Sequence, residues 1–149
     1  MTETVQSAVQ TGVDLSLILS IIGAITGVSG MVVGILGVVR SRYQTVSEFF
    51  SAVEKPEFIR ARGAVYAAKE FAVGDENAAY VINFFHHWGL MAKKHYLPMW
   101  VFDGASGAGA VRLYERLEPH INRLRDKNGD KRYAEYFEWL CKKIGERHA

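Results

Sequence analysis

The stretch LSLILSIIGAITGVSGMVVGILGVV, from Leu15 to Val39, determines the architecture that we expect for this chain of 149 residues. Its 25 residues include no ionisable side chain, and Asp14 and Arg40 bracket it. About 20 apolar helical residues cross the hydrocarbon core of a bilayer. A buried helix of a water-soluble protein seldom runs so far without a polar face. The stretch therefore predicts a transmembrane helix over residues 15–39.

The flanking residues favour an uncleaved anchor over a signal peptide, and they predict its orientation. Residues 1–14, MTETVQSAVQTGVD, contain no Lys or Arg, whereas a signal peptide has a basic start and a shorter apolar core. Arg40 and Arg42 follow the span directly. The positive-inside rule places such a flank in the cytoplasm. We therefore expect a plasma-membrane protein with an extracytoplasmic tail at 1–14 and a cytoplasmic domain at 40–149.

Every glycine in the predicted span lies on one heptad stripe. The glycines follow each other at alternating steps of four and three residues, and the same rule reaches serines at both ends. Such a repeat keeps one face toward a partner if the helices supercoil left-handedly. Small residues let helix backbones approach closely in lipid. The glycine–serine stripe therefore predicts helix packing, most simply in a homo-oligomer, with another membrane protein as the alternative partner. Its members are Ser16, Ser20, Gly23, Gly27, Gly30, Gly34, Gly37 and Ser41.

Charge and cysteine content limit the classes of partner. The formal net charge is +2, so the chain as a whole is not a strong nucleic-acid binder. All 18 basic residues lie within residues 40–149. The same segment contains 14 of the 16 acidic residues, so its net charge is +4. This charge suits a domain beside an anionic leaflet, but it is also ordinary for a soluble domain. Cys141 is the only cysteine, so an intrachain disulfide is excluded.

Helix signals dominate the sequence after residue 43, and no strand-like alternation of useful length occurs. Thr45 or Ser47 is a candidate N-cap, unless the membrane helix continues into the domain. Pro56 and Asp75 mark the starts of the next two helices. We expect an all-α protein, with one N-terminal transmembrane helix followed by a compact cytoplasmic bundle of about four or five helices. Its apolar positions are Phe58, Ile59, Val65, Tyr66, Phe71, Ala78, Val81, Ile82, Phe85, Trp88, Gly89, Ala92, Val111, Tyr114, Leu117, Ile121, Leu124, Tyr133, Tyr136, Phe137, Leu140 and Ile144.

No motif predicts a catalytic, cofactor or metal site. His87 and His95 lie two helical turns apart, too far to share one ion, and no HExxH or CxxC is present. The segment GASGAG, residues 104–109, lacks the GK[ST] ending of a phosphate loop and reads as a loop or as the start of a helix. Cys141 lies mid-helix without the signature of a nucleophile. We therefore do not expect an enzyme.

Three hypotheses for function follow. The leading one is a single-pass membrane protein that self-associates through the glycine–serine stripe and presents a cytoplasmic interaction domain, as a scaffold or sensor. The second is a membrane-tethered enzyme acting on nucleic acid or nucleotides. It requires a cleft that brings together several of His87, Arg112, Glu115, His120, Arg125 and Glu138. The third is a small channel or permeabilising protein, with a pore lined by Ser16, Ser20, Thr26 and Ser29.

Three stretches together resemble a family of small bacterial proteins that have an N-terminal membrane helix and an uncharacterised helical domain. They are KPEFIRARGAVY, NFFHHWGLMAKKHYLP and RLYERLEPHINRLRD with YAEYFEWL, within residues 45–140. The resemblance implies a bacterial inner membrane as the location, and it implies no activity, cofactor or substrate. A departure is Tyr114, where that family often has Trp. The matching positions are Pro56, Glu57, Phe58, Arg60, Arg62, Phe84, Phe85, Gly89, Leu90, Leu117, Pro119, Ile121, Arg125, Phe137 and Leu140.

Overall fold

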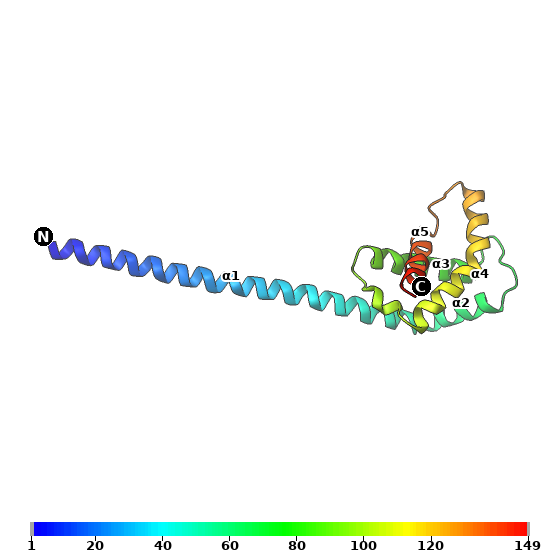
Figure 1. Ribbon diagram of the computed structural model, residues 1–149, viewed down its shortest axis with the longest axis horizontal. Coiled ribbons are helices and arrows are strands. Elements are labelled where there is room, and N and C mark those ends of the chain that lie inside the picture. The colour runs from blue at the N-terminus through cyan, green and yellow to red at the C-terminus, as the bar shows by residue number, and fades with distance from the viewer. Residues whose placement is uncertain (1, 149) are drawn as a thin grey trace. The chain divides into compact units, whose positions relative to one another are not determined.

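The computed structural model describes the backbone of residues 2–148 and the side chains of residues 18–20, 22–23 and 26–147. This part of the chain forms five α-helices and one short 3₁₀ helix and contains no strand, which confirms the all-α prediction. Figure 1 shows the elements in their order along the chain. They are α1 (Thr2–Val53), α2 (Pro56–Ala67), α3 (Glu76–Lys93), the 3₁₀ helix η1 (Met99–Phe102), α4 (Ala105–Asn128) and α5 (Glu135–His148).

Helix α1 is longer than the predicted membrane helix. It runs to Val53 without interruption, so neither Thr45 nor Ser47 begins a new helix, and the predicted N-cap is wrong. No glycine or proline follows Gly37 within α1, so no residue of low helix propensity breaks the backbone hydrogen bonds there. The structure therefore agrees with the alternative expectation that one helix continues into the domain.

The chain divides into two units, Met1–Ser41 and Arg42–Ala149. Among the residues whose side chains are described, no helix contains a stretch with the length and hydropathy of a membrane span. The predicted extracytoplasmic tail at 1–14 lies outside those residues, as does part of the predicted span at 15–39.

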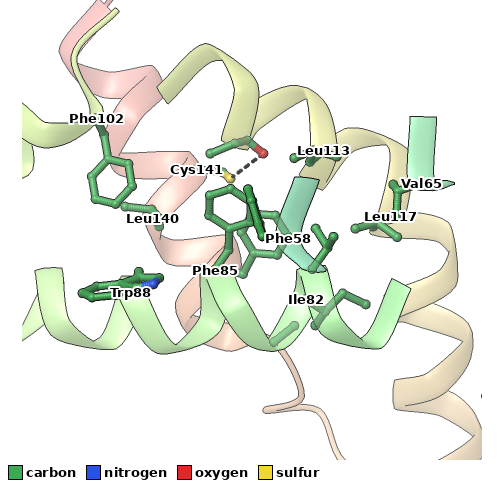
Figure 2. Packing of buried hydrophobic residues seen from close by; sticks show 14 of the residues in the cluster. Phe58, Val65, Ile82, Phe85, Trp88, Phe102, Leu113, Leu117, Leu140 and Cys141 are labelled. Carbon is green, nitrogen blue, oxygen red and sulfur yellow. Dashed lines mark hydrogen bonds between the residues drawn. The ribbon is translucent and has the colours of Figure 1, made fainter. Parts of the chain in front are cut away.

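Helix α3 forms the centre of the second unit. The Asp75 side chain caps it by accepting a hydrogen bond from the backbone N–H of Ala78 at 2.9 Å, as the sequence predicts. All seven apolar positions expected on its core face are buried. The helix contacts α2, α4 and α5, and the rings of Phe85 in α3 and Phe137 in α5 stack with centroids 4.8 Å apart. Figure 2 shows how α2, α4 and α5 contribute apolar side chains to the same core.

Two glycines are required for close packing in this unit. A Cβ atom added at Gly89 in α3 would overlap the backbone carbonyl oxygen of Tyr136 in α5. One added at Gly107, in the first turns of α4, would overlap the carbonyl oxygen of Phe102. Segment 104–109 therefore includes the start of a helix rather than forming a loop, and its small residues let α4 begin directly beside η1.

Arginines of α4 hold the end of α2. The last carbonyl groups of a helix have no partner within it, and here another helix supplies one. Arg116 Nε donates to the carbonyl oxygen of Val65 at 2.7 Å, and its Nη2 donates to the carbonyl oxygen of Ala68. Arg123 donates to the carbonyl oxygen of Phe71 at 3.3 Å, beyond the end of α2. The segment that follows α2 is thus fixed to α4 through its main chain.

Helix α5 begins later than its apolar pattern predicts. The stretch KRYAEYFEWLCKKIGERHA predicts a helix that starts near Lys131, whereas the structure starts α5 at Glu135. Ala134, directly before it, has a left-handed backbone with φ of 61°, which cannot continue as a right-handed helix. Tyr133 consequently lies in the connection, and both it and Tyr136 are only partly buried.

Candidate functional site

The glycine–serine stripe lies along α1. An α-helix drifts by about 20° per heptad relative to a 3.5-residue repeat, so the glycines from Gly23 to Gly37 stay on one side of the helix over two heptads. A Cβ atom added at any of these glycines would meet nothing within 4 Å. Ser20 and Ser41 extend the stripe in the described part of the chain, whereas the side chain of Ser16 lies outside it. The stripe therefore leaves helix backbone uncovered over two heptads.

Apolar side chains surround this stripe. Every large apolar side chain described between Ile18 and Val39 is 44% to 69% exposed. The hydroxyl group of Thr26 donates to the carbonyl oxygen of Ile22 at 2.8 Å, so the helix itself satisfies this polar group. This part of α1 thus presents an apolar surface and a strip of small residues without a second element of its own unit to cover them.

A cleft of about 650 Å³ lies in the second unit, bounded by α2, by α4 and by the last turns of α1. Its two cationic side chains are Arg62, from α2, and Arg112, from α4. Among the described residues, neither arginine has an ion-pair partner. The apolar part of the lining consists of Phe49, Val53, Phe58, Ile59, Phe85, Ala110 and Leu113, and the rest consists of Gly63, Tyr66, Ala105, Ser106 and Gly109.

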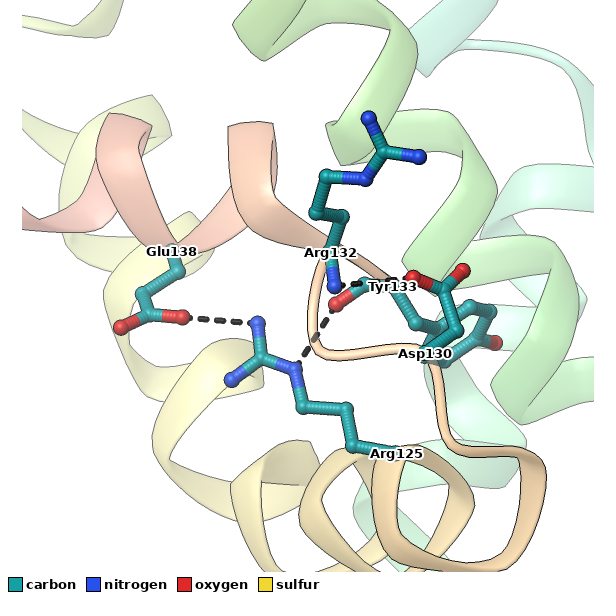
Figure 3. Close-up of polar contacts among 5 residues, drawn as sticks. All are labelled: Arg125, Asp130, Arg132, Tyr133 and Glu138. Atoms are coloured by element: carbon teal, nitrogen blue, oxygen red, sulfur yellow. Dashed lines mark hydrogen bonds and ion pairs between the residues drawn. The ribbon is translucent and has the colours of Figure 1, made fainter.

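Two of the six residues proposed for an enzyme site form an ion pair. Arg125 Nη2 lies 2.7 Å from Glu138 Oε2, and Arg125 Nε donates to the carbonyl oxygen of Tyr133 at 2.9 Å. Figure 3 shows both bonds and the nearby turn, in which Asp130 accepts from the backbone N–H of Arg132 at 3.0 Å. The arginine thus ties α4 to the connection before α5 and to α5 itself. A structural role in joining these elements is sufficient to explain both side chains, without a role in catalysis.

Two other candidate groups for chemistry, His120 and Cys141, are buried. His120 is 2% exposed and lies beside the ring of Phe71, and its Nδ1 atom has no hydrogen-bond partner in the described structure. Burial lowers the pKa of His120, and the neighbouring Arg123 adds to that shift. The thiol of Cys141 donates to the carbonyl oxygen of Ala110 at 3.7 Å, and burial raises the pKa of this thiol far above its usual range. A thiol with a raised pKa has little nucleophilic thiolate.

The remaining residues of that set do not meet the ion pair. His87 is exposed on α3 beside the ring of Trp88, and Arg112 and Glu115 are exposed on α4. Among the described residues, hydrogen bonds and ion pairs join only Arg125 and Glu138 of the six. No group of three His, Cys, Asp or Glu side chains within the described ranges could hold a metal ion.

Sequence reasoning missed the cleft. Ile59 and Tyr66 belong to the apolar positions of α2, yet they are 48% and 42% exposed at its edge. The sequence signal that could have indicated it was the run of small residues at 104–110. Close packing explains the glycine at Gly107 but not at Gly109, so Gly109 leaves space beside α4. The opposing wall is contributed by α2, so the cleft depends on tertiary packing that neither segment encodes alone.

Residues 13–144 match the model of a family described as a domain of unknown function, DUF4760. The matched range includes both the apolar part of α1 and the helices of the second unit. Comparison with curated proteins and with solved structures found no match.

Proposed function

The chain belongs to the DUF4760 family of domains of unknown function, and we propose that it is a single-pass membrane protein that self-associates through its glycine–serine stripe. In this proposal residues 40–149 form a cytoplasmic interaction domain, acting as a scaffold or sensor module. The partners are the lipid bilayer and a second copy of the chain.

The support for a membrane location comes from residues 15–39. They contain no ionisable side chain, and 25 residues are enough to cross a bilayer with some tilt. The one threonine in this stretch bonds to its own helix, as a polar side chain in hydrocarbon needs to do. Arg40 and Arg42 are exposed directly after the stretch, where the positive-inside rule predicts the cytoplasmic side of a bacterial inner membrane.

The observation that carries self-association is the row of glycines from Gly23 to Gly37, each with open space where a Cβ atom would be. In lipid no hydrophobic force drives helices together, so association depends on close contact of their surfaces. A single stripe can meet its own copy across a two-fold axis, because such an interface uses the same surface on both chains. The seven-residue repeat favours a left-handed crossing angle near +20°.

Substitutions on two sides of α1 test this proposal. Gly27→Leu with Gly30→Leu adds bulk on the stripe, and Ser29→Leu adds bulk about 200° around the helix from Gly27 as the matched control. We expect chemical crosslinking in native membranes to give dimers or larger species for the unaltered chain and for Ser29→Leu. The double glycine variant should give mainly monomer. Equal crosslinking of all three proteins contradicts packing through the stripe.

A separate measurement tests the membrane location. After alkaline carbonate washing, the unaltered chain should stay with the membrane pellet, and a reporter fused after Ala149 should be active on the cytoplasmic side only. Release of the chain into the carbonate supernatant overturns the anchor, whatever the crosslinking shows.

A further inference from the structure

The cleft between α2 and α4 has the size and lining of a small-molecule site. Its volume of about 650 Å³ lies within the range of roughly 300–1,000 Å³ found for ligand pockets, which are mainly apolar with a few polar groups. Phe58, Phe85 and Leu113 line it from the buried core, whereas Ile59 and Tyr66 line it at an exposed edge. An apolar ligand in this cleft would therefore run from solvent to the core.

Glycines keep the cleft open. A Cβ atom added at Gly63 of α2 or at Gly109 of α4 would meet nothing within 4 Å, although both residues lie inside helices. Glycine disfavours a helix interior. At Gly89 and Gly107 a close backbone contact explains why the residue is glycine, but no such contact exists at Gly63 or Gly109. Replacing either cleft glycine with a larger residue would instead fill the space.

Two of the polar side chains in the cleft are cationic. Arg62 and Arg112 extend from opposite walls, and the guanidinium carbon of Arg62 lies 5.9 Å from the centre of the Phe58 ring. In contrast to Arg116 and Arg125, these two arginines form no ion pair or hydrogen bond with the described part of the protein. The Ser106 hydroxyl donates to the carbonyl oxygen of Val101 at 2.6 Å, so the positive charges dominate the polar lining.

We propose that this cleft binds a long-chain carboxylate, with its alkyl chain against the aromatic lining and its head group held by Arg62 and Arg112. The complementarity is of two kinds. An apolar lining accepts an alkyl chain because it removes that chain from water. A guanidinium group donates two parallel hydrogen bonds to one carboxylate, which would fix the head group beside the arginines. This ligand site is independent of the proposed self-association of α1.

A photoreactive fatty acid can test the site in the full chain. The probe is a 12-carbon carboxylate bearing a terminal diazirine, and it is added to the protein in phosphatidylcholine nanodiscs. Peptide mass spectrometry then maps the labelled residues. The expected adducts lie on residues 58–66 and 105–113. Unlabelled dodecanoate should suppress them, and dodecyltrimethylammonium, which has the same chain length with a cationic head, should not.

Variants connect the labelling to the cleft. Arg62→Gln with Arg112→Gln should weaken the apparent affinity for dodecanoate about tenfold or more, because charge-assisted hydrogen bonds are lost. Arg60→Gln, on an exposed position of α2 outside the cleft, is the matched control and should leave the affinity unchanged. Gly109→Leu should block labelling by filling the space, and circular dichroism shows whether that variant keeps its helices.

Three results overturn the proposal. Adducts confined to residues 15–39 would mean that the probe entered only with the lipid. Equal labelling of the double arginine variant and the unaltered chain, or equal competition by the cationic amphiphile, would mean that the arginines do not select the ligand. The arginine substitutions replace partly or fully exposed side chains, so the test does not depend on the folding of Gly109→Leu.

Discussion

Replacing Gly89 with alanine tests the closest helix contact in the second unit. The added methyl group would overlap the backbone carbonyl oxygen of Tyr136, which cannot move aside as a flexible side chain would. We expect α3 and α5 to separate slightly, with a loss of packing between them. Gly63→Ala is the matched control, because it makes the same chemical change inside α2 with no atom within 4 Å of the new Cβ.

The two substitutions should have opposite signs. Alanine in place of glycine stabilises an exposed helix interior by about 0.5–1 kcal/mol. Forcing an extra carbon into a packed contact costs about 1–3 kcal/mol. Gly63→Ala should therefore raise the free energy of unfolding by somewhat under about 1 kcal/mol. Gly89→Ala should lower it by about 1–2 kcal/mol after the gain in helix propensity is subtracted.

Thermal unfolding of the full chain, followed by circular dichroism in one detergent, measures this difference. For a domain of about 100 residues, 1 kcal/mol corresponds to a shift of roughly 4 °C in the midpoint. The midpoint of Gly89→Ala should thus lie about 5–10 °C below that of Gly63→Ala. If both variants unfold at or above the midpoint of the unaltered chain, the close approach of α3 to Tyr136 is wrong.

Five other side chains give sharper local tests. Asp75→Ala removes the N-cap of α3 and should cost about 1 kcal/mol in urea unfolding; no loss would mean that the cap contributes nothing. Arg125→Ala should cost more than Glu138→Gln, which should cost under about 1 kcal/mol because Glu138 is half exposed and only the arginine also holds a carbonyl group. Burial holds the pKa of His120 below 6.5, so below pH 6.5 the unfolded chain binds a proton that the folded chain resists. The free energy of unfolding should therefore be highest above pH 6.5 and fall as the pH drops toward the folded pKa. The urea midpoint of His120→Leu should vary less between pH 8 and 5 than that of the unaltered chain. Cys141 should resist iodoacetamide at pH 8 until urea unfolds the chain; rapid alkylation of folded protein would contradict its burial.

Local signals predicted most of the bundle. Asp75 and the regular apolar spacing of α3 are sufficient to place that helix, because its cap and its buried face are both encoded within a few turns. Pro56 likewise begins α2, since proline suits the first turn of a helix. The start of α5 was missed because the left-handed conformation of Ala134 is not favoured by its own side chain. Contacts from another element, such as the bond from Arg125 to the carbonyl of Tyr133, hold this connection.

The cleft and the roles of the arginines could not be predicted in the same way. Arg112, Arg116, Arg123 and Arg125 lie on one helix and look alike in the sequence. Their roles differ because each faces a different neighbour, which only the tertiary structure determines. The glycines of α1 are the opposite case, because their spacing is visible in the sequence alone.

The bonds from Arg116 to the end of α2 have a consequence for mutation and for the order of folding. They reach main-chain oxygens, which every amino acid carries, so the side chains at Val65 and Ala68 can vary without removing these bonds, whereas Arg116 cannot. The bonded residues are separated by 48 and 51 positions in the chain. The end of α2 therefore becomes fixed only after α4 has docked, and a fragment that stops before α4 should fray at this end. For these two bonds the sensitivity to substitution is thus one-sided: exchange of Arg116 removes them, whereas Val65 is constrained by its burial in the core.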